Sequence, residues 1–391
     1  MRILLSSTYG YGHIYPMVPL ARAFVAAGHE VLWATSADSC RHVAATGIEA
    51  AAAGLAGDDL RVAMRDLHTA AAEVAPQDRA AFLYPRMFGE TFTPPMVADL
   101  LPLARQWRPD LLIHEHGELA SPVVGAILDV PSVTHSFGGA IPAAFVAAAG
   151  ERTAAVWAAH GLTQPPYAGC FTTLYLDICP PSVQSVPMDH IDAVQQLRPV
   201  AAADSAVGAL PAYLSLDARP LVYVTLGTVS NHMPVLRGAV DGLSSLPVRV
   251  LVAVGPDGDP AALGPQPSNV HVERWVDQAL VLEHCALVVS HGGSGTFLGA
   301  LARGLPQLCL PQAADQFRNA TGGVRGGAAL ALTPADASPA AIARDVRRLL
   351  EEDGFRTGAG HVAAEIRHMP SPADVVAILT AEAASRPSAV S

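Results

Sequence analysis

The segment His291-Gly292-Gly293-Ser294-Gly295-Thr296 directly follows an apolar run, Ala286 to Val289, and precedes a helical pattern. It therefore predicts a strand–turn–helix. Glycines let a ligand approach the backbone closely, and the free N–H groups and dipole of a helix N-terminus favour an anion. Asp315 and Gln316 follow a second strand-like run, Gln307 to Leu310, and could receive polar groups attached to that anion. The stretch predicts a diphosphate site.

A second glycine-rich turn lies near the start of the chain. Tyr9-Gly10-Tyr11-Gly12-His13 follows the strand-like run Arg2 to Ser6, and Pro16 opens an apolar-periodic helix that Gly28 can end. This pattern places a histidine at the tip of a turn. The two turns are far apart in the sequence, so a cleft between two domains is the simplest way to use both.

Apolar runs and helical patterns alternate along the chain, which predicts an α/β protein with two doubly wound parallel sheets. Its 391 residues also favour two domains. We expect an N-terminal domain over 1–200, a linker over 201–211 and a C-terminal domain over 212–370. Strands are expected at 2–8, 30–35, 110–115 and 130–135 in the first half, and at 221–226, 248–254, 270–273, 286–290 and 307–310 in the second.

Composition excludes several classes of protein. The net charge of -11 argues against nucleic acid and anionic membrane as partners. All 24 basic residues are arginine, so a P-loop, a pyridoxal enzyme and a Schiff-base aldolase, which need lysine, are excluded. Five scattered cysteines and the absence of a secretory signal pattern predict a cytoplasmic protein. The uncharged stretch 130–150 is broken by proline and glycine and predicts a buried strand and a loop rather than a membrane span.

Several motifs in a fixed order resemble the inverting family 1 glycosyltransferases of GT-B fold, and most closely the bacterial branch that decorates natural products such as macrolides, aromatic polyketides and enediynes. The resemblance covers nearly the whole chain. The motifs are Gly12-His13 with Pro16, His114-Glu115, Asp177-Ile178-Cys179-Pro180-Pro181-Ser182, Thr225-Leu226-Gly227-Thr228, Trp275-Val276-Asp277-Gln278, the 291–296 turn, and Asp315-Gln316.

This resemblance implies two Rossmann-like domains facing a central cleft, with a final helix, 371–391, that packs back on the N-terminal domain and ends in a frayed tail. It implies sugar transfer from a nucleotide-sugar to a hydroxyl of a hydrophobic aglycone. The long segments 54–95 and 138–182 are candidates for the acceptor pocket. The implied donor-binding residues are Gly12, Gly227, Thr228, Trp275, Val276, Gln278, His291, Gly293, Ser294, Gly295, Thr296, Asp315 and Gln316, and the implied acceptor-binding residues are Tyr11, Phe88, His135 and Phe137.

The chemistry needs a base for the acceptor proton and stabilisation of the departing diphosphate. His13 can take a proton near neutral pH, and we assign it as the general base. Glu115 matches the position of the family's acidic partner, where aspartate is usual and glutamate is one methylene longer. His291 resembles the family residue that hydrogen-bonds the diphosphate, and preorganised donors of this kind would replace a metal. We therefore expect no metal and no other cofactor.

Two departures from the family pattern bear on specificity. Plant members carry a glutamate eight residues beyond the histidine that binds both ribose hydroxyls, but here that position is Gly299. Without this carboxylate, selection for a 2′-hydroxyl is weaker, which fits a dTDP-sugar, with a deoxysugar as the transferred group. The second departure is Asp277, which stands before Gln278 where the family often has proline. Transfer to carbon rather than oxygen stays open, as does a homodimer.

Other classes of protein, and metal sites, are alternative interpretations of some of these residues. A serine hydrolase could use Ser294, Asp315 and His361 or His368, although the elbow pattern Gly-x-Ser-x-Gly is not met. A catalytically silent homologue that activates a partner transferase is a third class. Metal could in principle bind His114 and His116, or the Asp257-Gly258-Asp259 stretch. For the last, a solvated turn is the better interpretation.

Overall fold

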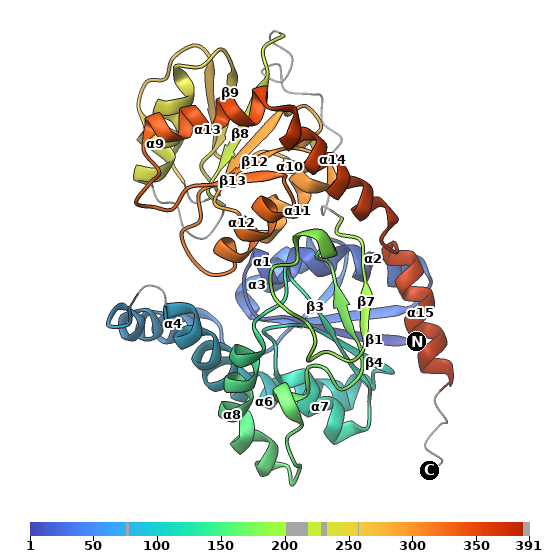
Figure 1. The fold of residues 1–391 in the computed structure, drawn as a ribbon. Coiled ribbons are helices and arrows are strands. Elements are labelled where there is room, and N and C mark those ends of the chain that lie inside the picture. Colours follow the sequence, from blue (N-terminus) through green and yellow to red (C-terminus); the bar gives the residue numbers. More distant parts are fainter. Residues whose placement is uncertain (76–77, 201–217, 228–232, 257, 386–391) are drawn as a thin grey trace. The chain divides into compact units, whose positions relative to one another are not determined.

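A computed structural model describes residues 1–75, 78–200, 218–227, 233–256 and 258–385. The contacts between Cα atoms divide the chain into two units (Figure 1). Unit 1 comprises Met1–Ile178, Val186–Arg198 and Pro370–Ser391, and unit 2 comprises Cys179–Ser185 and Pro199–Met369. The linker predicted at 201–211 lies outside the described residues.

The segment Cys179–Ser185 departs from the predicted division, which assigned it to the N-terminal domain. Ser182 N donates to Glu365 Oε1 at 3.1 Å, and Ser185 Oγ donates to the Arg318 carbonyl at 2.9 Å. The Val183 carbonyl packs directly against Gly322, where no side chain could fit. These contacts attach the segment to the helices of unit 2.

Unit 1 contains a parallel sheet of seven strands in the order β3-β2-β1-β4-β5-β6-β7. Its inner strands are apolar runs buried on both faces, as parallel strands require. The strands are β1 (Arg2–Ser6), β2 (Glu30–Thr35), β3 (Glu49–Ala52), β4 (Leu111–Glu115), β5 (Ser132–His135), β6 (Tyr175–Asp177) and β7 (Val194–Gln196). The helices are α1 (Tyr11–Ile14), α2 (Val18–Ala26), α3 (Ala37–Ala44), α4 (Gly57–Ala72), α5 (Arg79–Tyr84), α6 (Thr93–Trp107), α7 (Ala120–Leu128), α8 (Ala143–Ala159) and α15 (Pro372–Ser385), with the π-helix η3 (Pro85–Phe92) and the short 3-10 turns η1 (Tyr15–Met17) and η4 (Pro166–Gly169).

Unit 2 contains a parallel sheet of six strands in the order β10-β9-β8-β11-β12-β13. The strands are β8 (Leu221–Thr225), β9 (Arg249–Ala253), β10 (Val270–Glu273), β11 (Leu287–Ser290), β12 (Gln307–Cys309) and β13 (Ala329–Ala331). The helices are α9 (Met233–Ser244), α10 (Gln278–Leu282), α11 (Ser294–Ala302), α12 (Gln316–Arg325), α13 (Pro339–Glu351) and α14 (Asp353–His368), with turns η5 (Pro181–Val183) and η7 (Pro260–Leu263).

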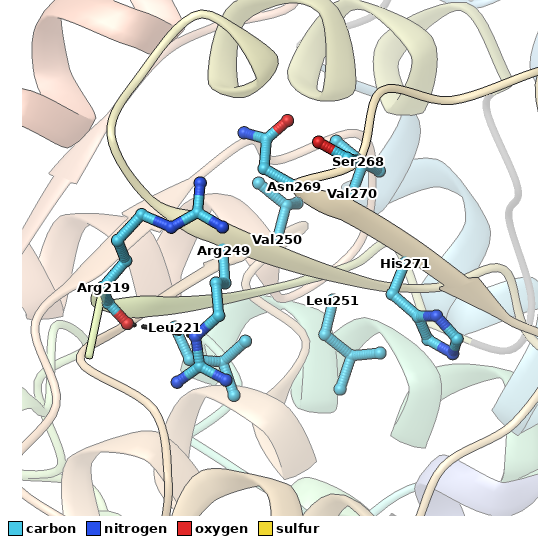
Figure 2. A pocket seen from close by; sticks show the side chains of 9 residues that line it. All are labelled: Arg219, Leu221, Arg249, Val250, Leu251, Ser268, Asn269, Val270 and His271. Atoms are coloured by element: carbon cyan, nitrogen blue, oxygen red, sulfur yellow. Dashed lines mark hydrogen bonds between the residues drawn. The ribbon is translucent and has the colours of Figure 1, made fainter. Parts of the chain in front are cut away.

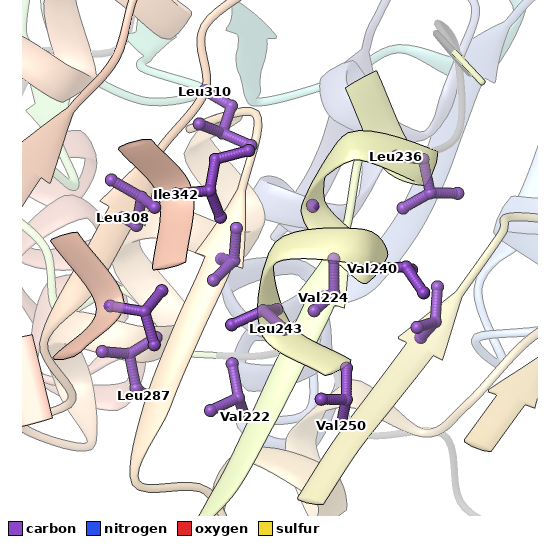
Figure 3. Packing of buried hydrophobic residues seen from close by; sticks show 14 of the residues in the cluster. Val222, Val224, Leu236, Val240, Leu243, Val250, Leu287, Leu308, Leu310 and Ile342 are labelled. Atoms are coloured by element: carbon purple, nitrogen blue, oxygen red, sulfur yellow. The ribbon is translucent and has the colours of Figure 1, made fainter. Parts of the chain in front are cut away.

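The core of unit 2 explains why these segments become strands and helices. Val222 and Val224 alternate with residues facing the opposite side of β8, and they contact a cluster shared with Leu236, Val240 and Leu243 of α9 (Figure 3). Side chains of a strand alternate between faces, whereas helical side chains three and four apart share one face. The two periods therefore bring one apolar strand face against one apolar helix stripe.

The prediction of two doubly wound parallel sheets is confirmed. All nine predicted strands are present, each within a few residues of its expected bounds, but β3, β6, β7 and β13 were not predicted. The last helix, α15, packs against α2 within unit 1. In the part of the chain that the structure describes, no helix is both long and apolar enough to span a bilayer.

Candidate active site

In both sheets the strand order reverses at one point, which is where ligands of open α/β sheets bind. In unit 1 the reversal lies between β1 and β4, with His13 following β1 and Glu115 ending β4. In unit 2 it lies between β8 and β11, with Gly227 following β8 and His291 following β11. The predicted residues of each unit therefore meet at the carboxyl edge of its own sheet.

His13 lies on a short helix rather than at the tip of the predicted turn. Gly10, with φ of 99°, precedes α1, and the His13 N–H donates to the Gly10 carbonyl at 3.2 Å. The positive φ is accessible to glycine at no steric cost. The His13 side chain is 25% exposed, and its Nδ1 lies 3.0 Å from Glu115 Oε1. Glu115 therefore holds the Nδ1 edge of the imidazole in place.

Glu115 is fully buried and tightly held. Its Oε1 accepts from the Thr8 hydroxyl at 2.7 Å and from the Thr8 N–H at 3.3 Å, and its Oε2 accepts from the Gly117 N–H at 2.5 Å. Although burial alone would raise the pKa of this carboxyl, His13 and these donors lower it to about 2. Glu115 is therefore an ionised acceptor facing His13.

Aromatic side chains surround the imidazole of His13. The ring centroid of Phe137 lies 4.9 Å from that of His13, and the centroid of Phe88 lies 5.7 Å away. Phe88 comes from η3, a π-helix, a form often found at functional sites. Tyr11 instead stacks on Tyr15 at 5.3 Å and contacts His42. The structure thus brings Phe88 and Phe137, but not the Tyr11 ring, against the predicted base.

His135 is fully buried at the end of β5, with Nδ1 directed at the Ser136 carbonyl. Its predicted contact with an acceptor stays a prediction. Burial lowers the pKa of this imidazole to about 4, and the bond to the Ser136 carbonyl and the nearby Glu115 oppose the shift only in part. The side chain is therefore neutral at neutral pH.

This burial predicts acid sensitivity. Below pH 6.5 the unfolded chain binds a proton at His135 that the folded protein does not bind, so stability falls by about 3 kcal/mol as the pH drops towards 4. Glu115 adds a loss between pH 4.5 and 2, where only the unfolded carboxyl is protonated. His135→Gln should flatten the loss between pH 6.5 and 5 in urea unfolding, whereas an unchanged pH slope would contradict this explanation.

In unit 2, the predicted glycine-rich turn joins β11 to α11. Gly292 has φ of 80°, and its N–H donates to Ser290 Oγ at 3.0 Å. Gly293 is the N-cap of α11 and no side chain caps the helix, so the predicted helix N-terminus is present with its backbone N–H groups uncapped by side chains. Burial lowers the pKa of His291, so its imidazole is a neutral hydrogen-bonding group rather than a cation.

The Asp315-Gln316 pair is bonded to this turn. Ser294 Oγ donates to Asp315 Oδ2 at 2.6 Å. Asp315 occupies the N-cap position of α12, yet its carboxylate makes no capping bond. The Gln316 side-chain oxygen accepts from the backbone N–H groups of Gln312 and Ala313 at 2.8 and 3.0 Å. Because that oxygen is engaged, Gln316 has its amide NH₂ left to offer to a ligand.

Asn319 was missed by the sequence analysis, although it completes this network. Its buried Nδ2 donates to the Gly292 carbonyl at 2.9 Å and to Ser294 Oγ and Asp315 Oδ2 at 3.0 Å each. It follows Asp315 by four residues, so both share one face at the start of α12. That spacing was the available signal.

Asn319→Ala is expected to lower the free energy of unfolding by about 1–3 kcal/mol, because buried acceptors lose their donor. Nucleotide binding should weaken because the 292–294 turn loses its hydrogen bonds from Asn319 of α12. Asn269→Ala is the matched control, since Asn269 also donates to two carbonyls, Ser244 and Val248, but precedes β10 at the other edge of the sheet. Calorimetry should separate the two variants, and equal nucleotide affinities would contradict this role.

The residues of the 275–278 motif differ in exposure. Trp275 is 47% exposed, so it does not belong to the core. Val276 is buried, and Asp277 caps α10 by accepting from the Leu280 N–H, which explains the departure from proline. Thr296 Oγ1 donates to Gln278 Oε1 at 2.9 Å. Gly227 packs against the His291 ring. Thr228 lies outside the described residues.

The structure weighs against the alternative chemistries. In a hydrolytic triad a histidine lies between serine and aspartate, but here Ser294 donates directly to Asp315. His114 Nδ1 lies 2.6 Å from the Glu118 carbonyl, and its Nε2 lies 2.9 Å from Thr134 Oγ1, so neither nitrogen is available to a metal. Asp259 accepts from the Ala261 N–H at the start of η7, while Asp257 lies outside the described residues.

A cavity of about 80 Å³ in unit 2 belongs to the opposite edge of the sheet. Arg219, Arg249 and Asn269 line it where β8, β9 and β10 begin (Figure 2). Arg249 Nε donates to the Arg219 carbonyl at 3.1 Å. In unit 1 a cavity of about 350 Å³ likewise lies where β1 and β3 begin. Neither cavity includes a predicted site residue.

Comparisons with known proteins agree with this geometry. Residues 22–218 and 239–382 match the family models for the N-terminal and C-terminal domains of erythromycin biosynthesis protein CIII-like proteins. Elloramycin glycosyltransferase ElmGT of Streptomyces olivaceus is 35% identical over 97% of each chain, and L-demethylnoviosyl transferase of Streptomyces niveus is 33% identical over 98% of each.

Solved structures extend the similarity to the fold. Glycosyltransferase VinC in complex with dTDP superposes with a TM-score of 0.82 and 26% identity, covering 99% of this chain and 100% of that one. Spinosyn rhamnosyltransferase SpnG complexed with spinosyn aglycone gives a TM-score of 0.79 and 29% identity, covering 97% and 100%. The two parallel sheets are those of the GT-B fold, and the chain belongs to the EryCIII-like family of natural-product glycosyltransferases.

Proposed function

We propose that this glycosyltransferase moves a sugar, with a deoxysugar as the best candidate, from a dTDP-sugar to a hydroxyl of a hydrophobic natural-product aglycone, with inversion and without a metal. The observation that carries the proposal is the 3.0 Å contact between His13 Nδ1 and the buried carboxylate of Glu115. A base needs a defined tautomer and orientation, and this contact supplies both.

His13 acts as the general base in this proposal. Glu115 is ionised, so it accepts a hydrogen bond and keeps the imidazole proton on Nδ1. The other nitrogen, Nε2, is then unprotonated and can take a proton from the acceptor hydroxyl. The acceptor oxygen forms a bond to the anomeric carbon as the bond from that carbon to the diphosphate oxygen breaks. The electron pair leaves with dTDP, and attack opposite the leaving group inverts the configuration.

The donor assignment rests on the turn after β11. Backbone N–H groups at the start of α11 and the neutral His291 offer donors to a diphosphate without a cation, whereas the Ser294 and Thr296 hydroxyls already donate to Asp315 and Gln278. Trp275 is 47% exposed, and an indole ring offers a large face on which a nucleobase could stack. Relatives VinC, SsfS6 and SpnG have been solved with dTDP, which supports the same nucleotide here.

The acceptor assignment rests on the aromatic surroundings of His13. Phe88 and Phe137 contact its ring, and they belong to or border an apolar cluster in unit 1 with Phe92, Tyr84 and Ile141. Such side chains favour an apolar acceptor that carries a hydroxyl. SpnG has been solved with spinosyn aglycone, and ElmGT is named for elloramycin, which supports a natural-product aglycone.

The test is turnover by the purified chain alone, using dTDP-glucose or dTDP-rhamnose and a panel of aromatic polyketide and macrolide aglycones. Calorimetry should show tighter binding of dTDP than of UDP. Binding of neither nucleotide would contradict the donor assignment. Turnover only after a second protein is added would favour the alternative of a silent activator.

Removal of metal is expected to leave the rate unchanged. Among residues outside the gaps in the structure, no group of three His, Cys, Asp or Glu side chains could hold a metal, and helix and side-chain donors would stabilise the leaving group instead. Turnover should therefore be equal within about twofold in EDTA and in MgCl₂, relative to the tenfold or larger loss that a catalytic metal would give. A loss in EDTA that Mg²⁺ restores would contradict metal independence.

A further inference from the structure

Thr8 contacts the carboxylate of Glu115 with two donors, and none of the motifs in the sequence includes it. Its hydroxyl lies 2.7 Å from Glu115 Oε1, and its backbone N–H lies 3.3 Å from the same oxygen. This oxygen is also the one that faces His13 Nδ1 at 3.0 Å. Thr8 and His13 therefore meet on a single oxygen atom.

The other carboxylate oxygen is held by the turn that follows β4. Glu115 Oε2 accepts from the Gly117 N–H at 2.5 Å. Gly117 has no room for a side chain, because a Cβ there would lie 2.7 Å from Phe88 Cε1. The same Phe88 ring contacts His13, so the turn, the carboxylate and the imidazole pack as one group.

Thr8 is itself held by a hydrogen bond from the neighbouring strand. Its carbonyl accepts from the Thr35 hydroxyl at 3.2 Å, and that hydroxyl accepts from Ser7 Oγ at 3.3 Å. Thr35 ends β2, the strand beside β1, so the position of Thr8 follows from the register of the sheet. A donor placed by the sheet is preorganised and needs no rearrangement when the reaction occurs.

We infer that Thr8 is a positioning residue, which together with the Gly117 N–H holds the glutamate so that its Oε1 faces His13 Nδ1. Glutamate has one more rotatable bond than aspartate, so an unrestrained carboxylate would spread over several rotamers. The two donors select one of them. The inference rests on the proposed role of His13 and Glu115 in catalysis and adds the group that fixes their geometry.

The direct test is NMR of the imidazole N–H of His13, which needs no substrate. A proton held between Nδ1 and a carboxylate exchanges slowly and should give a low-field resonance that His13→Ala removes. The resonance should persist in Thr8→Ser, which keeps the hydroxyl, and broaden or disappear in Thr8→Val, which removes it at nearly constant volume. Loss of the resonance in Thr8→Ser as well, or its retention in Thr8→Val, would overturn the inference.

Turnover gives the second measurement. Thr8→Val should lower kcat by about 10- to 100-fold with little change in the KM values, because misplacement of a catalytic group affects the transition state more than binding. Thr8→Ala removes the same hydroxyl without adding a methyl group and serves if the valine variant does not fold. Thr46→Val is the matched control, since the half-buried Thr46 hydroxyl donates to the Val43 carbonyl at 2.7 Å and not to the carboxylate, and it should stay within about twofold of the parent.

The outcomes separate this inference from the proposed function. Full activity of His13→Ala would remove the proposed base, and the role of Thr8 with it. An inactive His13→Ala beside a fully active Thr8→Val would leave the proposed function intact and overturn only the inference.

Discussion

Replacement of His13 by alanine is expected to lower kcat by about 10²- to 10⁴-fold, the usual contribution of a general base. KM for the nucleotide-sugar should change little, because the implied donor-binding residues other than Gly12 belong to unit 2. Glu115→Gln should lose a similar amount. An amide lacks the charge that stabilises the imidazolium. If the NH₂ group of the amide is turned towards His13, its hydrogens repel the proton on Nδ1. Initial rates at saturating dTDP-sugar measure both effects.

His68→Ala is the matched control for His13, because His68 is an exposed histidine on α4 in the same unit. It should retain the parent rate. Glu115→Asp keeps the charge but withdraws it by one methylene, so it should fall between the parent and Glu115→Gln. Equal rates for the parent and for His13→Ala would remove the base from the mechanism, whichever acceptor is used.

The sequence predicted those parts of the fold that depend on strong local patterns. Strands such as β8 and β11 are apolar runs, and buried parallel strands require such runs. The missed β3 is Glu-Ala-Ala-Ala and the missed β13 is Ala-Leu-Ala, and alanine has little preference for strands. These segments become strands because a neighbouring strand supplies the hydrogen bonds. Such a contact is not visible in the local sequence.

The same distinction applies to the site. Glu115 and His291 were assigned from the resemblance to family motifs, and the roles of His13, Glu115 and His291 stay predictions. The structure shows that each follows or ends a strand at the carboxyl edge of a parallel sheet, where ligands bind. Thr8 and Asn319 could not be assigned in this way, since threonine after a strand and asparagine in a helix are ordinary residues. The role of Thr8 depends on its contact with Glu115, which is more than a hundred residues away in the sequence. The role of Asn319 depends on its contacts with the 292–294 turn. Tertiary packing alone makes these contacts.

Gly293→Ala is expected to weaken dTDP binding by about 10- to 100-fold, the loss of one or two hydrogen bonds to a charged group. A Cβ at this position would lie 2.3 Å from His291 Nε2, far inside normal contact. The backbone itself would accept alanine, since Gly293 has φ of -63° and ψ of 142°. The ring also packs against Gly227, where a Cβ would lie 2.7 Å from Nε2, so it has little room to retreat. The imidazole must therefore leave its place, which calorimetry with dTDP should detect.

A double-mutant cycle distinguishes displacement of His291 from direct obstruction of the nucleotide. If the methyl group acts by displacing the ring, Gly293→Ala should cost nothing further once His291→Ala has removed that ring. Gly360→Ala, in α14 with open space around the new Cβ, controls for the exchange of glycine by alanine and should bind dTDP normally. Additive losses in the double variant would mean that the turn contacts the diphosphate through its backbone, with His291 acting separately.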